Sequence, residues 1–277
     1  MRILVALDQD MRSAHTLSQV TQLLVNTWAN VTLLGIVPRK SDDGGVPMDF
    51  VDTMNQYHKA VLQGFAAEDL PYAPADDDYE IAEIRPGIYE KIGNTHGGIK
   101  ELTVRIRVGN PTQTILEEAQ DCGSDLIVLH GDMDSQQKIA TKADCSVLIV
   151  KKERDTGRIL CFLDDDLLSQ RSLEMITQMA VLFNAEIEIA GLTDKQSVEE
   201  KIEKKLDWLI HYFNGKGIQP WIQLVALSYL EPFILEQDHW SLVTMWMGET
   251  SIFKRLFSVN KVAKLLESRK SSVLLLR

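Results

Sequence analysis

The sequence has few cysteines, no long apolar run and no excess of basic residues. Its three cysteines, Cys122, Cys145 and Cys161, are widely spaced and odd in number, which argues against a disulfide framework and favours a reducing compartment. No apolar run approaches the roughly 20 residues that span a bilayer, and the first residues lack the pattern of a signal peptide. The net charge of −11 argues against non-specific nucleic-acid binding. We therefore expect a cytoplasmic protein that binds neither nucleic acid nor membranes.

Patterns typical of metal sites and catalytic groups are also missing. The six histidines are scattered, and none stands at metal-ligand spacing from a cysteine or another histidine. Asp8, Asp10 and Ser13 have the residue types of a triad, but no histidine is tied to them, and helix N-capping explains them better. His130 follows an apolar run and suits a general base, although a local hydrogen bond is the simpler interpretation. We predict no metal site and no catalytic residues.

What the sequence does contain is an internal repeat. The stretches 2–17 (RILVALDQDMRSAHTL) and 158–173 (RILCFLDDDLLSQRSL) match at an offset of 158 − 2 = 156 residues. The match runs without a gap to Gly35 and Gly191. A period of this length indicates a duplicated domain rather than a solenoid. A charged, glycine-ended linker separates the copies, so we predict domains at 1–153 and 157–277.

Short apolar strands and amphipathic helices alternate in both halves. This alternation predicts the α/β class, with a doubly wound parallel sheet and helices on both faces in each domain. Pro220 lacks a backbone donor and should place its strand at a sheet edge. The expected strands are 3–7, 31–37, 104–108, 125–131 and 146–150 in the first half, and 159–163, 187–191, 218–224, 241–248 and 272–276 in the second.

The first half carries an additional segment at about 66–100. Its prolines, its acidic run and its glycine pair predict an insertion with little regular structure of its own. It leaves from the carboxyl edge of the second strand, so we expect it to form a lid over the neighbouring crevice or, slightly less favoured, a partner-binding surface. Long loops cost little free energy, so the insertion should be dispensable for folding. Part of it should nevertheless pack, because it contains Tyr72, Tyr79, Ile81, Ile84, Ile88, Tyr89 and Ile92.

Seven stretches of the two halves form a further pattern. They are ILVALD with Ser13, GNPTQTILEEA, DLIVLHG and CSVLIV, then ILCFLD with Ser169, SLVTMWMG and SVLLL. Together they resemble the UspA-like family of universal stress proteins, in its tandem two-domain form, over most of the chain outside 66–100. The resemblance implies a five-stranded parallel sheet of order 3-2-1-4-5 in each domain and a role in stress response through binding and signalling. It also implies an intrachain pseudo-dimer through the last strands, with a homodimer as a further assembly.

The same resemblance points to a nucleotide site at the crevice where strand order reverses. In ATP-binding members an aspartate after strand one contacts the nucleoside, and a glycine motif after strand four, G-x2-G-x9-G-[ST], cradles the phosphates. The first half offers Asp8 and Gly131. However, only 147 − 131 = 16 residues separate Gly131 from Val147, and Asp132 and Asp134 would repel phosphate. We predict that this first site is degenerate and does not bind ATP in the manner of the family.

The second half keeps a longer loop, of 273 − 248 = 25 residues from Gly248 to Val273. Gly248 matches the first glycine of the motif, and a serine replaces the second. Bound ATP would bring Mg²⁺ to the nearby aspartates, while an eroded loop with solvated basic residues is the competing interpretation. The candidate nucleotide-binding residues are Asp164, Gly248, Ser251, Lys254, Ser258 and Asn260.

These patterns predict a binding and signalling protein with degenerate nucleotide sites. An ATP sensor that uses only the second domain is one alternative, and a nucleotide hydrolase or transferase is another. The sequence identifies neither a protein partner nor a small-molecule ligand.

Overall fold

The structure is a computed structural model of the chain. It describes residues 1–8, 14–38, 45–66, 69–73, 80–92, 98–131, 135–151, 157–163, 169–193, 200–236, 240–248 and 271–277. Its contacts divide the chain into two compact units, Met1–Val150 and Lys151–Arg277. Both units are α/β, with helices on both faces of a sheet.

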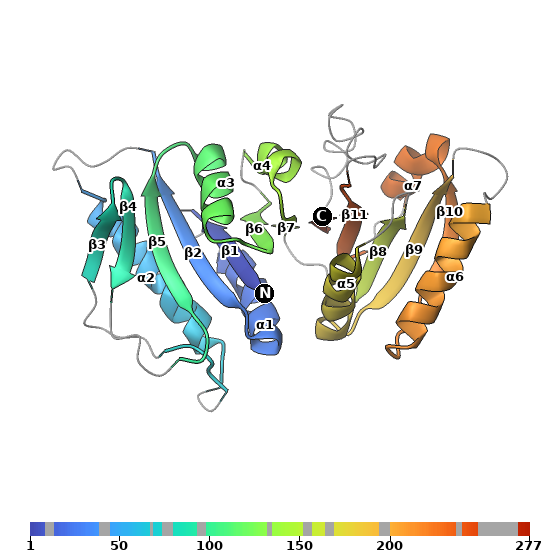
Figure 1. The fold of residues 1–277 in the computed structure, drawn as a ribbon, viewed down its shortest axis with the longest axis horizontal. Helices are drawn as coiled ribbons and strands as arrows, with labels where there is room; N and C mark the ends of the chain where they lie inside the picture. Colours follow the sequence, from blue (N-terminus) through green and yellow to red (C-terminus); the bar gives the residue numbers. More distant parts are fainter. Residues whose placement is uncertain are drawn as a thin grey trace. The chain divides into compact units, whose positions relative to one another are not determined.

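The first unit is built around a sheet whose central strand is covered on both faces (Figure 1). Ile3, Leu4 and Val5 are all buried, as expected for a parallel strand between helical layers. Its elements are β1 (Arg2–Leu7), α1 (Ala14–Thr27), β2 (Asn30–Val37), α2 (Met48–Gln63), β3 (Glu80–Arg85), β4 (Ile88–Ile92), β5 (Leu102–Val108), α3 (Pro111–Asp121), β6 (Leu126–His130), α4 (Gln136–Lys142) and β7 (Ser146–Val150).

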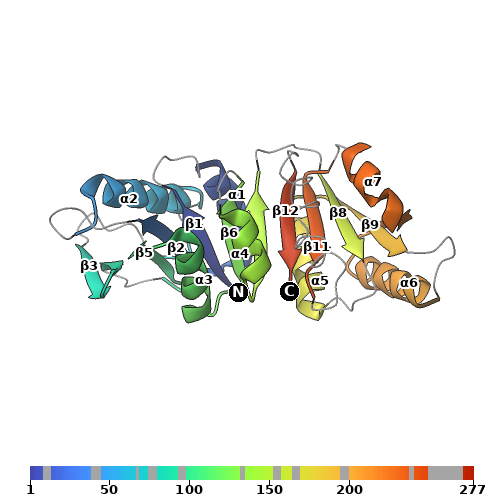
Figure 2. The same ribbon diagram turned by 90° about the horizontal axis from the view of Figure 1, so that it is seen from above.

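The strand order in this unit is β7-β6-β1-β2-β5-β4-β3. The pairs among β7, β6, β1, β2 and β5 are parallel. Helices α1 and α2 cover one face of the sheet, and α3 and α4 cover the other (Figure 2). The chain therefore winds in opposite directions on the two sides of β1, and in such sheets the ligand crevice is expected at the carboxyl ends of the two strands at the reversal, here β1 and β6.

The insertion differs from its prediction. Its described residues 80–92 have regular structure, because β3 and β4 form an antiparallel hairpin, and β4 pairs antiparallel with β5. The first sheet therefore has seven described strands instead of five, and β4 runs antiparallel to both of its neighbours. The hairpin extends the far edge of the sheet (Figure 1). Since β5 and β2 separate it from β1, it does not cover the crevice, and the expected lid is wrong for the described part of the insertion.

The expected packing of the insertion is confirmed for two of its apolar residues. Tyr72 and Tyr89 are buried, whereas Ile84 and Ile92 are exposed. The Tyr72 hydroxyl donates a hydrogen bond of 2.7 Å to the carbonyl oxygen of Ala29. Tyr72 is therefore part of the core of the first unit.

The second unit has the strand order β10-β9-β8-β11-β12, and all of its strand pairs are parallel. Helices α5 and α6 lie on one face and α7 on the other (Figure 2). The edge position of β10 confirms the prediction from Pro220, but the strand begins at Trp221 and not at residue 218, because Pro220 has no N–H to donate. Its elements are β8 (Arg158–Leu163), α5 (Gln170–Leu182), β9 (Glu186–Thr193), α6 (Glu200–Asn214), β10 (Trp221–Ala226), a 3₁₀ turn (Leu227–Tyr229), α7 (Leu230–Glu236), β11 (Leu242–Trp246) and β12 (Ser272–Leu276).

Two expectations from composition can be compared with the described residues. All three cysteines are free, as their low number predicts. None of the helices in the described part of the chain is long and apolar enough to cross a membrane.

Candidate functional site

The candidate site in each unit lies where strand order reverses. This point falls between β1 and β6 in the first unit and between β8 and β11 in the second. Loops that follow the carboxyl ends of these strands form the usual ligand crevice of such sheets. Among the described residues, Asp8 and Gly131 directly follow β1 and β6, and Gly248 lies two residues beyond β11.

Asp8 follows β1 directly and is half-buried. Its Oδ1 accepts a hydrogen bond of 3.1 Å from the hydroxyl of Tyr57. Tyr57 lies on α2 and is fully buried, so α2 fixes the position of the carboxylate from below the crevice. Tyr57 was not identified from the sequence, because the contact joins residues 49 positions apart and depends on how α2 docks.

Gly35 explains why α2 comes this close to the sheet. A Cβ at this position would lie 2.7 Å from the Met54 sulfur and 2.7 Å from the Phe50 ring. Both side chains are buried residues of α2. The absence of a side chain at Gly35 therefore sets the distance at which α2 packs, and this distance lets Tyr57 reach Asp8.

Gly131 directly follows β6, at the carboxyl edge of the first sheet. It is buried, and its N–H donates a 2.7 Å hydrogen bond to the carbonyl oxygen of Val150. Helix α4 begins at Gln136, so only four residues, DMDS, stand between Gly131 and the helix. This connection holds no further glycine and contains two aspartates. It is a short acidic link rather than a phosphate-binding loop.

Most of the predicted second-unit site lies outside the described residues. This applies to Asp164, Ser251, Lys254, Ser258 and Asn260. Gly248 is described and follows β11 by two residues.

The strand register corrects the alignment of Gly248. Leu126 pairs with Ile3, and Leu242 pairs with Ile159, so these two strands begin at equivalent positions. Counting the same number of residues forward along each strand makes Met247, and not Gly248, the equivalent of Gly131. The equivalence is supported by a matching hydrogen bond, since the Met247 N–H donates to Leu276 as the Gly131 N–H does to Val150. The first glycine of the motif is therefore shifted by one residue in the second unit.

The residues at the end of β11 serve as packing. Met245 and Met247 are 0% and 1% exposed, so both side chains belong to the core of the second unit. Trp246, between them, is only half-buried.

A buried thiol lies in the strand next to β11. Cys161 of β8 is buried, and burial raises the pKa of its thiol to about 12. It is therefore protonated and unreactive at neutral pH. Cys145, directly before β7, is half-exposed.

Groups of three His, Cys, Asp or Glu side chains able to hold a metal ion do not occur among the residues that the structure describes. A cation at either crevice would therefore need ligands from the loops outside this set, or from a bound nucleotide.

No protein-family model matches the chain, and neither does any curated protein. Solved structures do match it. A universal stress protein from Archaeoglobus fulgidus aligns with a TM-score of 0.63 and 10% identity, over 100% of this chain and 96% of that one. A Pseudomonas aeruginosa protein assigned to the universal stress proteins gives 0.62 and 17% identity, over 99% and 92%. The cytoplasmic domain of a prokaryotic cation chloride cotransporter gives 0.60 and 12%, over 99% and 94%.

At these identities the likeness shows the fold alone. The chain has the α/β fold of universal stress proteins, and the same fold serves in the cytoplasmic domain of a transporter. Fold likeness does not transfer residue roles, so function must be argued from the sites.

Proposed function

We propose that the chain acts by binding and signalling, as a stress-response protein of the universal-stress type, and not by turnover. We further propose that its two units are tandem copies of one doubly wound domain. The strand registers support this duplication. Arg2 pairs with Asn30, and the two residues that lie 156 positions later, Arg158 and Glu186, also pair with each other. Association of the two halves as an intrachain pseudo-dimer stays a prediction.

One observation carries the functional proposal. The first crevice has only four residues between Gly131 and α4, and two of them are aspartates. A loop of this length has too few backbone N–H groups to surround a triphosphate, and its carboxylates repel one. The first unit is therefore unsuited to ATP, which removes one of the two sites that a duplicated ATP-binding domain would offer.

The second unit favours a second candidate function, a nucleotide sensor that uses one site. From Met247 to Val273 the chain has 273 − 247 = 26 residues, ten more than the corresponding stretch of the first unit. This longer loop contains Lys254 and Arg255, which have the charge that phosphate requires. Asp164, at the offset of 156 residues from Asp8, would contact the nucleoside.

Calorimetric titration of the full-length chain with Mg-ATP separates these candidates. Asp164→Asn and Asp8→Asn are matched variants of the two crevices. If ATP binds, binding should be lost in Asp164→Asn and kept in Asp8→Asn, whereas loss in Asp8→Asn alone would overturn the assignment to the second unit. If the wild type binds no ATP, the sensor is excluded, and mass spectrometry of small molecules released from the denatured protein identifies other ligands.

A hydrolase or transferase is the remaining alternative, and phosphate release tests it. We expect no sustained release from ATP above the rate without protein. Multiple turnovers that disappear in Asp164→Asn would instead make the chain an enzyme and contradict the proposal.

A further inference from the structure

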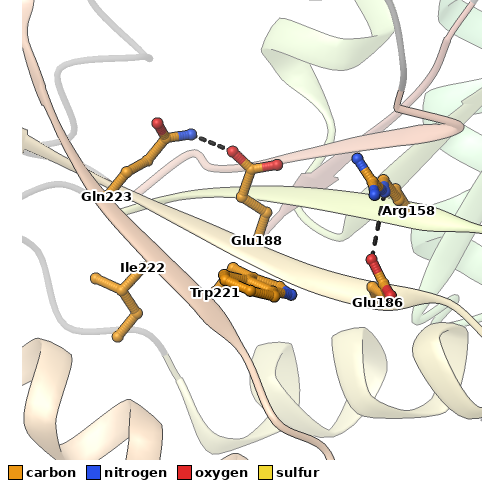
Figure 3. A pocket seen from close by; sticks show the side chains of 6 residues that line it. All are labelled: Arg158, Glu186, Glu188, Trp221, Ile222 and Gln223. Atoms are coloured by element: carbon orange, nitrogen blue, oxygen red, sulfur yellow. Dashed lines mark hydrogen bonds and ion pairs between the residues drawn. The ribbon is translucent and has the colours of Figure 1, made fainter.

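A groove of about 460 Å³ opens on the second unit, at the opposite end of the sheet from the crevice. Arg158, Glu186 and Trp221 are the first residues of β8, β9 and β10. The groove therefore lies at the amino ends of three neighbouring strands. Figure 3 shows the six side chains that line it, which are Arg158, Glu186, Glu188, Trp221, Ile222 and Gln223.

Most of these side chains share one face of the sheet. Arg158 pairs with Glu186, and Glu188 pairs with Trp221. Residues at paired positions and at positions two apart along a strand point to the same face. The indole of Trp221 thus lies on the face that carries both carboxylates, and it is 68% exposed. An aromatic surface of this size left in contact with solvent is available to a ligand.

The two carboxylates are held in place. Glu188 accepts hydrogen bonds from Gln223 and, at 2.7 Å, from the buried indole N–H of Trp240. Glu186 forms an ion pair of 3.3 Å with Arg158. An ionised carboxylate has about four acceptor positions, and the Glu186 side chain is 60% exposed, so Glu186 can accept a further donor. The lining side chains together carry two negative charges and one positive charge.

The equivalent face of the sheet in the first unit provides a comparison. Its strand registers place Asn30 and Thr32 where the second unit has Glu186 and Glu188, and Arg105 where it has Gln223.

In the first unit the guanidinium of Arg105 is bound by two carboxylates. One belongs to Glu90 of β4 and the other to Glu118 of α3. The positive charge there comes from the third parallel strand, and one of the negative charges comes from the covering helix.

In the second unit the negative charges lie on the sheet instead of on the covering helix. The carboxylates stand on the sheet, the third strand has Gln223 in place of the arginine, and α7 (LEPFILE) contains no lysine or arginine. The helix is also shorter, with seven residues against eleven in α3. The face therefore carries two carboxylates of its own and has glutamine in the position of Arg105, and the groove lies beside these side chains.

We propose that this groove binds a guanidinium group from outside the chain. A planar guanidinium can stack on the Trp221 indole while its N–H groups bond to the carboxylates of Glu186 and Glu188. A primary ammonium fits less well, because it lacks the flat surface and the fork of parallel donors. The group can belong to a free guanidino compound or to an arginine in an extended peptide. Within the described strands of the second unit, β10 has a neighbour on one side only, so a peptide can pair along it.

The test is an NMR titration of the full-length chain that follows the indole N–H signal of Trp221. N-acetylarginine amide should shift this signal with a dissociation constant on the order of 1 mM, and N-acetyllysine amide at the same ionic strength should bind several-fold more weakly. Trp221→Leu, which removes the stacking surface, should weaken binding about tenfold when followed by the Gln223 amide signals. The matched control is Trp208→Leu, because Trp208 is also exposed, at 54%, but lies on α6. It should leave binding unchanged.

A gain of charge provides a second test. Gln223→Arg supplies the guanidinium from the chain itself, as Arg105 does in the first unit. It should abolish binding while the urea midpoint of the protein is kept or raised.

The two sources of the group are distinguished by comparing N-acetylarginine amide with a five-residue extended peptide that has arginine at its centre. Tenfold tighter binding of the peptide assigns the site to a peptide, and equal binding assigns it to a small guanidino compound. The proposal is overturned if neither ligand shifts the Trp221 signal, if the lysine amide binds as well as the arginine amide, or if Gln223→Arg still binds.

Discussion

At the scale of single residues, Gly35 has a direct effect on stability. Gly35→Ala places a methyl group 2.7 Å from the Met54 sulfur and the Phe50 ring, so α2 must move or its side chains must leave their preferred rotamers. Overpacking of this kind costs about 1–3 kcal/mol of unfolding free energy. Urea denaturation measures this loss.

Gly191 is the matched control for this prediction, since it stands at the offset of 156 residues. Its added Cβ would meet the ends of Leu224 and Leu206 at 3.1 and 3.4 Å. Gly191→Ala should therefore cost less than Gly35→Ala. Equal losses from the two variants would mean that the close docking of α2 is not the cause.

His58 on α2 makes the first unit sensitive to acid. Burial, together with the charges of Lys91 and Lys59, lowers the pKa of His58 from 6.5 to about 4. Between these two values the unfolded chain binds the proton and the folded chain does not. Stability is therefore fully present above pH 6.5 and falls as the pH decreases toward 4, by up to about 3 kcal/mol.

Urea unfolding at a series of pH values measures this dependence, with His58→Gln as the comparison. The variant removes the titrating group, so its unfolding free energy should fall less between pH 6.5 and 4. If the two proteins lose stability in parallel, other groups cause the acid sensitivity, and the role given to His58 is wrong.

At the scale of elements, helix α3 is attached to β5 by a buried carboxylate. Glu118 is 1% exposed and contacts the guanidinium groups of both Arg105 and Arg107. Burial opposes the charge on Arg105, but hydrogen bonds and Coulombic attraction from Glu90 and Glu118 outweigh it and raise the pKa of Arg105 above its ordinary value. The guanidinium of Arg105 therefore stays charged beneath the helix.

Glu118→Gln leaves this charge without one of its main partners, and we expect a loss of about 3 kcal/mol or more in unfolding free energy. Glu117→Gln is the neighbouring control. Glu117 also pairs with Arg107, but its side chain is 46% exposed, so its loss should be below about 1 kcal/mol. Similar unfolding free energies for the two variants would contradict the attachment of α3 through Glu118.

The inserted hairpin and its base should respond differently to deletion. Segments 69–73 and 98–100 are held together by hydrogen bonds of 2.8 and 2.9 Å from the N–H groups of Ile99 and Lys100 to the carbonyl oxygen of Pro71. A Cβ on Gly98 would lie 2.6 Å from the Ala73 nitrogen, so these two residues are adjacent. Removing 74–97 and joining the ends through Gly-Ser should leave a folded protein.

Removing 70–98 also deletes Tyr72, whose ring packs edge-on against Phe65 at 5.5 Å. This longer deletion should cost about 3–5 kcal/mol more than the shorter one. Thermal unfolding of both variants measures the difference. Failure of the shorter variant to fold would show that the hairpin itself is part of the core.

The hairpin is the part of the fold that was not predicted from the sequence. Its strands, EIAEIR and IYEKI, flank Pro86-Gly87, and Gly87 adopts a φ of +73°. A proline-glycine pair with a positive φ at the glycine is a turn signal. Prolines were interpreted as marks of irregular chain, so this signal was missed. Most of the parallel strands were predictable because their apolar runs are nearly continuous.

The candidate site was only partly predictable. Asp8 and Gly131 follow apolar strands, so sequence alone places them at the carboxyl edge of the sheet. The contact of Tyr57 with Asp8 depends on Gly35 and on the docking of α2, which local patterns do not encode. The one-residue shift at Gly248 could be recognised only from the strand pairing. One additional apolar residue, Met247, stands between β11 and its glycine, whereas Gly131 follows β6 directly.

At the scale of the whole molecule, each unit has a core of its own. Leu4, Leu33 and Ile127 are fully buried in the first unit, and Leu160, Ala190 and Leu275 are fully buried in the second. Chains of about 150 residues bury enough surface to fold alone. We therefore expect the fragment 1–153 to unfold cooperatively in urea, with an m-value smaller than that of the full chain, because m scales with the surface that unfolding exposes. In this fragment Glu118→Gln should cost as much as it does in the full-length protein, since Arg105 and Arg107 lie in the same unit. A fragment that binds a hydrophobic dye and unfolds without a cooperative transition would show that the first core depends on the second unit, and the two halves would then form one folding unit.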